Sequence, residues 1–332
     1  MSENFAILNR YIYDSLRTEI VCHAVKLNIV DHLIRKPMSA DDLAHIIQAH
    51  PQLLNRMLRY LVLFGILEEN DEIFSVTSLG LLLSDGHEEG MKERFIICSN
   101  YSFKVVKHLD HTIRTGGTAL ELALGMPVFD YLKEHPEDKE CFMRMLNKQS
   151  KIEARQILSV YDFSCFEHIV DIGGADGTLL IIILKSTPKV RGTVFDLPHI
   201  VEKAAEMIAE NKLGERCKTT AGNFFDSITV EGDCYLVKYV LHDWNDEKCI
   251  QILRNIGKRM DRKSKLLILE KILLSDDYFL QMDDFMLWIE ADGKERNISE
   301  FQALLRSAGF KMSRLIQMPT TKFTIIETVL SK

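Results

Sequence analysis

Several features that define large classes of proteins are missing from this sequence of 332 residues. No uninterrupted apolar run approaches the roughly 18 residues of a transmembrane helix, so no membrane span is expected. The chain does not open with a basic segment followed by an apolar one, which argues against a secretory signal. The seven cysteines form no CxxC pair, so we expect no zinc site and predict a cytoplasmic protein with reduced thiols.

An excess of basic charge is missing as well. The formal net charge is -7, and an acidic protein is a poor partner for nucleic acid unless one face is locally basic. Hydrophobic residues make up 46% of the chain and charged residues 27%, values typical of a soluble globular protein. The length predicts about two domains with a large core that requires no disulfides.

Residues 1–90 show the pattern of short helices followed by a small hairpin. Apolar residues recur at helical spacing, and Ser39, with an acidic residue three positions later, resembles a capping box. The run ILEENDEIFSVT contains two short β-prone stretches around a polar turn. The expected helices cover residues 9–34, 40–50 and 53–64, and helices followed by a hairpin indicate a winged helix.

The rest of the chain divides into a helical part and an α/β part. Residues 91–160 predict helices only, with breaks at glycines and prolines. In residues 161–332, short apolar runs alternate with helical stretches, which predicts a doubly wound, mostly parallel sheet. The last run has no clear crossover helix before it, so we expect an antiparallel last strand. The expected strands are HIVDI, GTVFD, KTTAG, DCYLVKYV, KLLILEKI and FTIIETVL.

A glycine-rich turn follows the first of these strands. HIVDI runs directly into Gly173-Gly174-Ala175-Asp176-Gly177, and such a turn lets the backbone approach a ligand at the carboxyl edge of the sheet. Asp196 ends the next strand, 23 residues after Gly173, which is close to the spacing at which an acidic residue reaches a ribose diol. The pair indicates nucleoside binding, with NAD still possible as the ligand, although a strand-end Asp can also cap the following helix.

Further motifs extend the pattern along the whole chain. VDIGGADG, FDLPHIVEKA, GNFF, VKYVLHDWNDE, LLILEKIL, MDDFMLW and DGKER occur in this order, and VFDYLKEHPE precedes them. In this arrangement the chain resembles the plant-type O-methyltransferase family, which includes caffeate methyltransferases, acetylserotonin methyltransferase and many bacterial relatives. The resemblance implies a Rossmann-like class I methyltransferase domain that uses S-adenosylmethionine and releases S-adenosylhomocysteine. It also implies that residues 1–90 form a winged-helix dimerisation domain and that the protein is a homodimer.

The resemblance also assigns the cofactor-binding residues. The glycine turn of the family holds the methionine part of the cofactor, and the strand-end acid binds the ribose. The usual Asp that accepts a hydrogen bond from the adenine amino group is Asn223 here, whose side-chain oxygen accepts without a charge. The implied cofactor residues are Gly173, Asp196, Leu197, Asn223, Phe224 and Lys238.

The same resemblance implies a catalytic set without a metal. His242 follows the strand YLVKYVL, at the strand end where α/β sites lie, and the acidic partners of its imidazole fall on Glu270 and Glu295. A phenol, with a pKa of about 10, is mostly protonated at neutral pH, so a positioned base is needed to accept its proton. A sulfonium is already a good leaving group and requires no metal to activate it. Residues of the implied substrate pocket are Asp243, Asp283 and Met286.

Other functions remain open at this point. A family member can keep the cofactor fold and perform chemistry other than methylation, or transfer the methyl group to nitrogen or carbon. A winged helix also suggests a transcriptional regulator, but residues 1–90 hold seven Lys and Arg against thirteen Asp and Glu, a charge that repels phosphate. We therefore expect an O-methyltransferase that acts on a hydroxyl of a small, aromatic metabolite.

Overall fold

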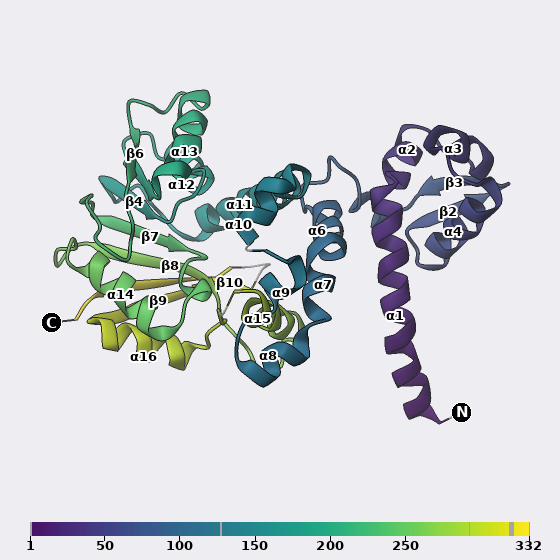
Figure 1. The fold of residues 1–332 in the computed structure, drawn as a ribbon. Coiled ribbons are helices and arrows are strands. Elements are labelled where there is room, and N and C mark those ends of the chain that lie inside the picture. The colour runs from purple at the N-terminus through teal and green to yellow at the C-terminus, as the bar shows by residue number, and fades with distance from the viewer. Residues whose placement is uncertain (1, 127, 292, 319–321, 332) are drawn as a thin grey trace. The chain divides into compact units, whose positions relative to one another are not determined.

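The computed structural model describes residues 2–126, 128–291, 293–318 and 322–331. The chain forms two compact units (Figure 1). The first unit contains Met1–Lys107 and Ala123–Gln149, and the second contains His108–Leu122 and Ser150–Lys332.

Helices begin the first unit, and left-handed residues separate them. The predicted helix over residues 9–34 is in fact two, α1 (Glu3–Lys26) and α2 (Ile29–Arg35), because Asn28 takes a left-handed conformation with φ of 54°. Helix α3 (Ala40–Ile47) begins where Ser39 accepts a hydrogen bond from the N–H of Asp42, and it ends three residues earlier than predicted. Helix α4 (Pro51–Leu63) begins with a proline, two residues before the expected range of residues 53–64, and ends one residue before the end of that range.

A small antiparallel sheet completes the winged helix. Strands β2 (Leu67–Asn70) and β3 (Ile73–Val76) form the predicted hairpin, and β1 (Met38–Ser39) pairs with the other side of β3. Asp71 and Glu72 both have positive φ, the conformation of a two-residue hairpin turn. The short helix α5 (Ser78–Leu81) follows.

The predicted helical stretch after residue 90 is confirmed. It contains α6 (Met91–Ile97), the π-helical turn η1 (Cys98–Ser102), α7 (Phe103–Val106), α8 (Leu109–Thr115), α9 (Leu120–Leu124), α10 (Val128–Glu134) and α11 (Pro136–Val160). Gly116 and Gly125, at two of the predicted breaks, have positive φ. Pro127, at another, lies outside the described residues.

A seven-stranded sheet organises the second unit. Its order is β6-β5-β4-β7-β8-β10-β9, with neighbouring strands parallel from β6 to β8, and β10 antiparallel to both β8 and β9. This confirms the Rossmann-like fold and the antiparallel last strand. The bounds are β4 (His168–Ile172), β5 (Arg191–Asp196), β6 (Cys217–Ala221), β7 (Cys234–Lys238), β8 (Lys265–Lys271), β9 (Phe310–Gln317) and β10 (Phe323–Leu330).

One strand was not predicted. All six predicted strands are present, but β9 is an additional edge strand, and most of its residues are exposed or only partly buried. An edge strand lacks the continuous apolar run of a strand buried on both faces, so its sequence gives little signal. Along the chain, two helices and β9 lie between β8 and the last strand, β10, although β8 and β10 are neighbours in the sheet.

Helices cover both faces of the sheet (Figure 1). One apolar cluster joins the sheet to α11, α12 (Thr178–Ser186) and α13 (Pro198–Glu210), and the other joins it to α14 (Asp246–Gly257) and α16 (Ile298–Ala308). Helix α15 (Tyr278–Glu290) precedes α16. Neighbouring residues of β4 and β7 enter opposite clusters, as the alternation of side chains along a strand requires. No described helix combines the length and apolar character needed to cross a membrane.

Candidate active site

The glycine turn lies at the carboxyl end of β4. Gly173 has φ of +69° and donates its N–H to the carbonyl oxygen of Phe195 at 2.8 Å. A Cβ at this position would approach Cγ2 of Val240 at 2.8 Å, closer than real side chains come. Both the backbone conformation and the neighbouring side chain therefore require glycine here.

Asp196 joins this turn to the end of β5. Its Oδ2 accepts a hydrogen bond from the N–H of Ala175 at 2.9 Å, and its Oδ1 accepts one from the N–H of Leu197 at 2.7 Å. Helix α13, which follows, has no side-chain cap. The carboxylate thus connects two loops rather than capping the helix, and each oxygen keeps a lone pair for a ligand hydroxyl.

Asn223 lies on the third loop of the same edge. Gly222, the residue before it, donates its N–H to the carbonyl oxygen of Asp196 at 2.9 Å, which holds this loop beside β5. The side-chain oxygen of Asn223 accepts a hydrogen bond from the N–H of Phe225 at 3.0 Å. The ring of Phe224 packs edge-on against that of Phe225, with centroids 4.9 Å apart. The structure therefore brings together the predicted residues of the β4, β5 and β6 loops.

Lys238, the last residue of β7, is paired with an acid that the sequence does not predict. Its Nζ lies 2.8 Å from Oε2 of Glu153 on α11 and donates to Oγ of Ser150 at 3.1 Å. Glu153 is 4% exposed. Because a buried charge requires a partner, this contact explains how Lys238 is held at the sheet edge.

His242 lies in the 3-10 turn η2 (Leu241–Asp243), just after β7. Its Nδ1 is 3.4 Å from Oε1 of Glu295 and 3.7 Å from Oε2 of Glu270. Its Nε2 is 3.4 Å from Oδ1 of Asp243. The structure thus places both predicted glutamates at one ring nitrogen and Asp243 at the other.

Glu270 is the penultimate residue of β8 and is completely buried. Its Oε1 accepts hydrogen bonds from the N–H groups of Val240 and Leu241, at 3.2 and 3.0 Å. Within the described residues its Oε2, the oxygen that faces His242, accepts no hydrogen bond. One oxygen therefore shapes the loop before His242, while the other acts on the imidazole.

Glu295 reaches the imidazole because its neighbours in sequence are bound to the His242 loop. Lys294 donates its N–H to the carbonyl oxygen of His242 at 2.9 Å. The guanidinium of Arg296 donates to the carbonyl oxygens of Leu241 and Trp244, at 2.9 and 2.7 Å. Arg296 is 1% exposed and was not predicted; its position directly after Glu295 in the motif GKER is the only hint in the sequence.

These contacts shift the proton affinity of the cluster. Burial alone would lower the pKa of His242, but the negative charge of Glu270, the hydrogen bond to Glu295 and the charge of Asp243 raise it to about 9. Burial raises the pKa of Glu270 to about 7, although the charge of His242 opposes this. The cluster therefore favours a proton on the imidazole, as a base that must stabilise its own imidazolium requires.

Two predicted substrate residues lie on α15. Oδ2 of Asp283 accepts a hydrogen bond from Nζ of Lys271 at 2.6 Å, and Lys271 directly follows Glu270. Met286 lies three residues further along the helix and is partly buried. Asp283 is thus connected to the end of β8, where Glu270, one of the predicted catalytic residues, lies.

Among the described residues, one group has the spacing of a possible metal site. It is the set of His242, Glu270 and Glu295, whose ligand atoms lie within 4.8 Å of one another. The same distances serve a base and its two carboxylate partners, so the geometry requires no ion.

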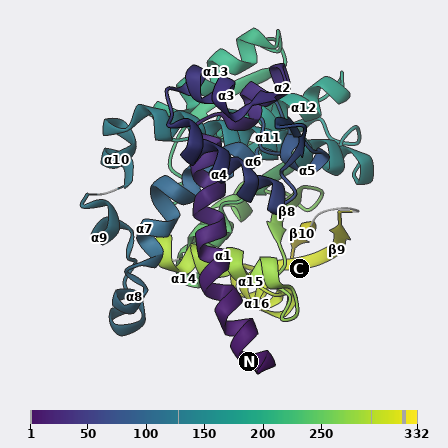
Figure 2. The ribbon, with the colours of Figure 1, turned by 90° about the vertical axis from the view of Figure 1, so that its right-hand side faces the viewer.

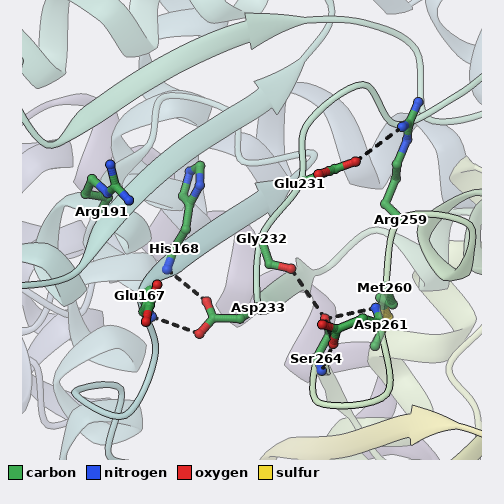
Figure 3. A pocket seen from close by; sticks show the side chains of 10 residues that line it. All are labelled: Glu167, His168, Arg191, Glu231, Gly232, Asp233, Arg259, Met260, Asp261 and Ser264. Carbon is green, nitrogen blue, oxygen red and sulfur yellow. Dashed lines mark hydrogen bonds and ion pairs between the residues drawn. The ribbon is translucent and has the colours of Figure 1, made fainter.

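A cavity of about 450 Å³ lies away from these residues (Figure 3). Ten residues from the starts of several strands and the loops before them line it, among them His168 at the start of β4 and Arg191 at the start of β5. Asp233 accepts hydrogen bonds there from the N–H groups of Glu167 and His168, both at 2.8 Å. The cavity therefore belongs to the amino-terminal edge of the sheet, opposite the loops that hold the predicted cofactor residues.

Comparison with known families matches both parts of the chain. Residues 106–311 match the O-methyltransferase domain, and residues 9–85 match the O-methyltransferase dimerisation domain.

Curated relatives include a phenazine O-methyltransferase of Lysobacter antibioticus, 34% identical over 302 residues that cover 90% of this chain and 89% of the relative. Another is the mitomycin biosynthesis 6-O-methyltransferase of Streptomyces lavendulae, 31% identical over 96% of this chain and 93% of the relative.

Solved structures give the same result. The structure of a mitomycin 7-O-methyltransferase superposes with a TM-score of 0.91 at 29% identity, covering 99% of this chain and 98% of that one. An O-methyltransferase from neocarzinostatin biosynthesis, solved with S-adenosylmethionine and 2-hydroxy-5-methyl naphthoic acid, superposes with a TM-score of 0.80 at 26% identity, covering 94% and 95% of the two chains.

Proposed function

Since this chain belongs to the family of S-adenosylmethionine-dependent O-methyltransferases, we propose that it methylates a hydroxyl group of a small aromatic metabolite with His242 as general base. The observation that carries the proposal is the position of the imidazole. Its Nδ1 faces the carboxylates of Glu270 and Glu295, at 3.7 and 3.4 Å. Nε2, which lies 3.4 Å from the partly exposed carboxylate of Asp243, is then the nitrogen that accepts the proton of the substrate.

The proposed reaction is an in-line displacement. S-adenosylmethionine supplies a methyl group on a sulfonium, which is a good leaving group. The acceptor oxygen forms a bond to the methyl carbon while the bond from carbon to sulfur breaks, and the hydroxyl proton passes to Nε2 of His242. In the neutral imidazole that acts as base, Glu270 and Glu295 keep the proton on Nδ1, and they stabilise the imidazolium that forms. A positioned base of this kind contributes on the order of 10² to 10⁴ in rate.

The residues of the sheet edge fit this cofactor. We assign the methionine part to the turn at Gly173, where a Cβ would close the space, and the ribose to Asp196 with Leu197 beside it. Free lone pairs on the Asp196 carboxylate suit two vicinal hydroxyls. Asn223 accepts from the adenine amino group, and Phe224 lies beside it on the same loop. Lys238 completes the set at the end of β7.

The relatives support an aromatic acceptor. Their names include a phenazine O-methyltransferase and a 3-amino-4-hydroxybenzoate 4-O-methyltransferase, the latter 30% identical over 91% of this chain. We propose that Asp243, Asp283 and Met286 line the acceptor site of this chain. Asp283 is fixed by its ion pair with Lys271, so it can orient a polar group of the acceptor.

We further propose that residues 1–90 form the interface of a homodimer. Helix α1 presents a row of exposed apolar side chains at helical spacing, and Figure 2 shows it as one long helix. In a monomer these apolar side chains remain in contact with water, which is unfavourable, whereas a second copy of the chain would bury them. The exposed apolar side chains of α1 are Phe5, Ile7, Leu8, Tyr11, Ile12, Tyr13 and Leu16.

The first test separates the cofactor site from the base. Isothermal titration with S-adenosylmethionine and S-adenosylhomocysteine should give micromolar binding to the wild type, and Asp196→Ala should lose it. Asp162→Ala, a change at an exposed acid before β4, is the matched control and should bind normally. His242→Ala should bind the cofactor but fail to methylate any member of a phenol panel that includes 3-amino-4-hydroxybenzoate and 1,4-dihydroxy-2-naphthoic acid. Full activity of His242→Ala would remove the base from the mechanism.

A further inference from the structure

We propose that Tyr239 is a positioning residue for His242, and that Glu153 fixes Tyr239 by accepting the hydrogen bond of its hydroxyl group. The inference rests on the proposed function, since it concerns the orientation of the base. It adds Tyr239, directly after β7, and Glu153, on α11, to the residues that support the proposed base.

The ring of Tyr239 lies against the imidazole. The two ring centroids are 5.2 Å apart and the planes differ by 19°, an offset stack. Tyr239 reaches this position through a left-handed backbone conformation, with φ of 51°, which is uncommon for an aromatic residue. Its N–H donates to the carbonyl oxygen of Leu269 at 3.2 Å, so the unusual conformation is held by β8. Strain of this kind at an active site indicates that the conformation has a use.

Glu153 holds the other end of the Tyr239 side chain. Its Oε1 accepts a hydrogen bond from the Tyr239 hydroxyl at 2.7 Å, and its Oε2 lies 2.8 Å from Nζ of Lys238. The same Nζ lies 4.6 Å from the centre of the Tyr239 ring. The tyrosine ring therefore contacts both a fixed cation and the imidazole, and the side chain cannot swing away from His242 without breaking its bond to Glu153.

The stack has a chemical consequence for the base. The face of an aromatic ring carries partial negative charge and attracts a cation, and a hydroxyl that donates to a carboxylate leaves its ring richer in electrons. Tyr239 therefore favours the imidazolium of His242 over the neutral ring. It also fixes the imidazole plane, in which Nδ1 faces the two glutamates and Nε2 faces Asp243 of the proposed acceptor site.

The other groups that face the imidazole come from its own turn and from two further segments. They are Asp243 on the same turn, Glu270 at the end of β8, and Glu295 in the loop before α16. Their carboxylates provide most of the stabilisation of the imidazolium. The contribution of Tyr239 is smaller and consists of orientation together with an attraction between ring and cation.

Glu153 also connects the base to the cofactor site. One carboxylate holds both Tyr239, which stacks on His242, and Lys238, which we assign to the cofactor site. One oxygen of Glu153 thus holds the ring beside the proposed base, and the other holds a residue of the proposed cofactor site.

The test is a titration of the His242 ring by NMR on histidine-labelled protein saturated with S-adenosylhomocysteine. His242→Asn identifies the signal among the 11 histidines. Tyr239→Leu, which removes the ring, should lower the midpoint by about half a pKa unit, the size of a partly exposed contact between a cation and an aromatic ring. Tyr239→Phe keeps the ring but loses the bond to Glu153, so its midpoint should lie between those of the wild type and Tyr239→Leu.

Tyr161→Leu is the matched control. Tyr161 is a buried tyrosine of the same unit whose hydroxyl donates to Glu327 at 2.8 Å, and it should leave the His242 midpoint unchanged. Each variant should bind S-adenosylhomocysteine within about twofold of the wild type, which shows that it is folded. An unchanged midpoint in Tyr239→Leu, or an equal shift in Tyr161→Leu, would overturn the inference. Because the titration needs no acceptor, it reports on the stack even if His242→Ala proves active and the proposed base fails.

Discussion

Arg296 donates a hydrogen bond from its guanidinium to the carbonyl oxygen of Leu241 at 2.9 Å, and these two residues directly neighbour Glu295 and His242. His242, the proposed base, and Glu295 are therefore held together by their neighbours in sequence, although more than 50 residues separate the two segments. This arrangement makes Arg296 essential for the geometry of a reaction in which it takes no chemical part.

Replacing Arg296 by lysine should damage the base and spare the cofactor site. A single ammonium cannot reach the carbonyl oxygens of Leu241 and Trp244 together with Asp246, so buried acceptors lose their partners. We expect a loss of about 2 to 4 kcal/mol in unfolding free energy and at least a tenfold lower methylation rate, because misplacement of catalytic groups is costly. Denaturant melts and rate assays measure both. Arg314→Lys, at a side chain that is 59% exposed, is the control, and equal losses in both variants would refute the assignment.

The rate should rise with pH. A base must be deprotonated to act, and the carboxylates around His242 raise its pKa to about 9 despite burial, so kcat/KM should climb between neutral pH and that value. Glu270→Gln removes the charge that does most to raise this pKa, while its amide oxygen can still accept from Val240 and Leu241. Its pH profile should therefore shift to lower pH, with a lower plateau. A profile identical to the wild type would show that Glu270 does not act on the base.

The same pKa shift affects stability. In the unfolded chain a histidine titrates at about 6.5, whereas His242 in the folded protein titrates at about 9. Its protonation therefore contributes stability that is fully present below about pH 6.5 and is lost as the pH rises through the folded pKa. The melting temperatures of the wild type and of His242→Asn should therefore differ at low pH and become similar above about pH 9.

An alanine at Gly173 should weaken cofactor binding. The backbone there has φ of +69° and a Cβ would lie 2.8 Å from Cγ2 of Val240, so the turn must move. We expect at least a tenfold loss of affinity for S-adenosylmethionine in a titration, together with destabilisation of about 1 to 3 kcal/mol. Gly116→Ala has a similar φ of +74° and open space around it, so it controls for backbone strain alone. Equal affinities of Gly173→Ala and Gly116→Ala for S-adenosylmethionine would show that the methionine part does not bind at the Gly173 turn.

An aspartate at position 223 should strengthen cofactor binding. The side-chain oxygen of Asn223 already accepts from the N–H of Phe225, and an aspartate keeps that bond while adding a negative charge. A charged acceptor is roughly twice as strong as a neutral one, which predicts about fivefold tighter binding of S-adenosylmethionine. Asn223→Ala should bind less tightly than the wild type. Weaker binding by Asn223→Asp would mean that adenine is not recognised at this position.

Charges on the exposed face of α1 should disrupt the homodimer. Leu8 and Ile12 are both 63% exposed and lie one turn apart, so glutamates at both positions would be buried against the second copy. Light scattering should show monomers for Leu8→Glu with Ile12→Glu, and dimers for the wild type and Arg10→Glu. If the double variant is still a dimer, the interface does not include this row of side chains.

The sequence predicts the sheet better than it predicts the contacts at its edge. HIVDI and KLLILEKI are continuous apolar runs because parallel strands are buried on both faces, and turn residues mark their ends. The edge strand β9 lacks that signal, and the break at Asn28 depends on one left-handed residue in an otherwise helical pattern.

In the site as well, some residues can be predicted from the sequence and others only from the folded structure. His242, Glu270 and Glu295 are identified by a resemblance that preserves their order along the chain. Arg296 bonds to Leu241, 55 residues away, and Glu153 bonds to Tyr239, 86 residues away, so neither contact leaves a local pattern in the sequence. The ring of Tyr239 stacks on His242, only three residues later, but it does so through a left-handed backbone conformation that the sequence does not announce. Such contacts depend on the folded sheet and can be recognised only in it.

The order of the strands also constrains how the protein can be made. Strand β10 is the last of the seven to be synthesised, yet it lies between β8 and β9. While the ribosome is still adding residues, the position that β10 will fill separates β9 from the rest of the sheet, and the inner edge of β8 has no partner. The α/β unit therefore cannot fold completely during translation until residues 323–330 have emerged, whereas the winged helix, encoded first, can form long before.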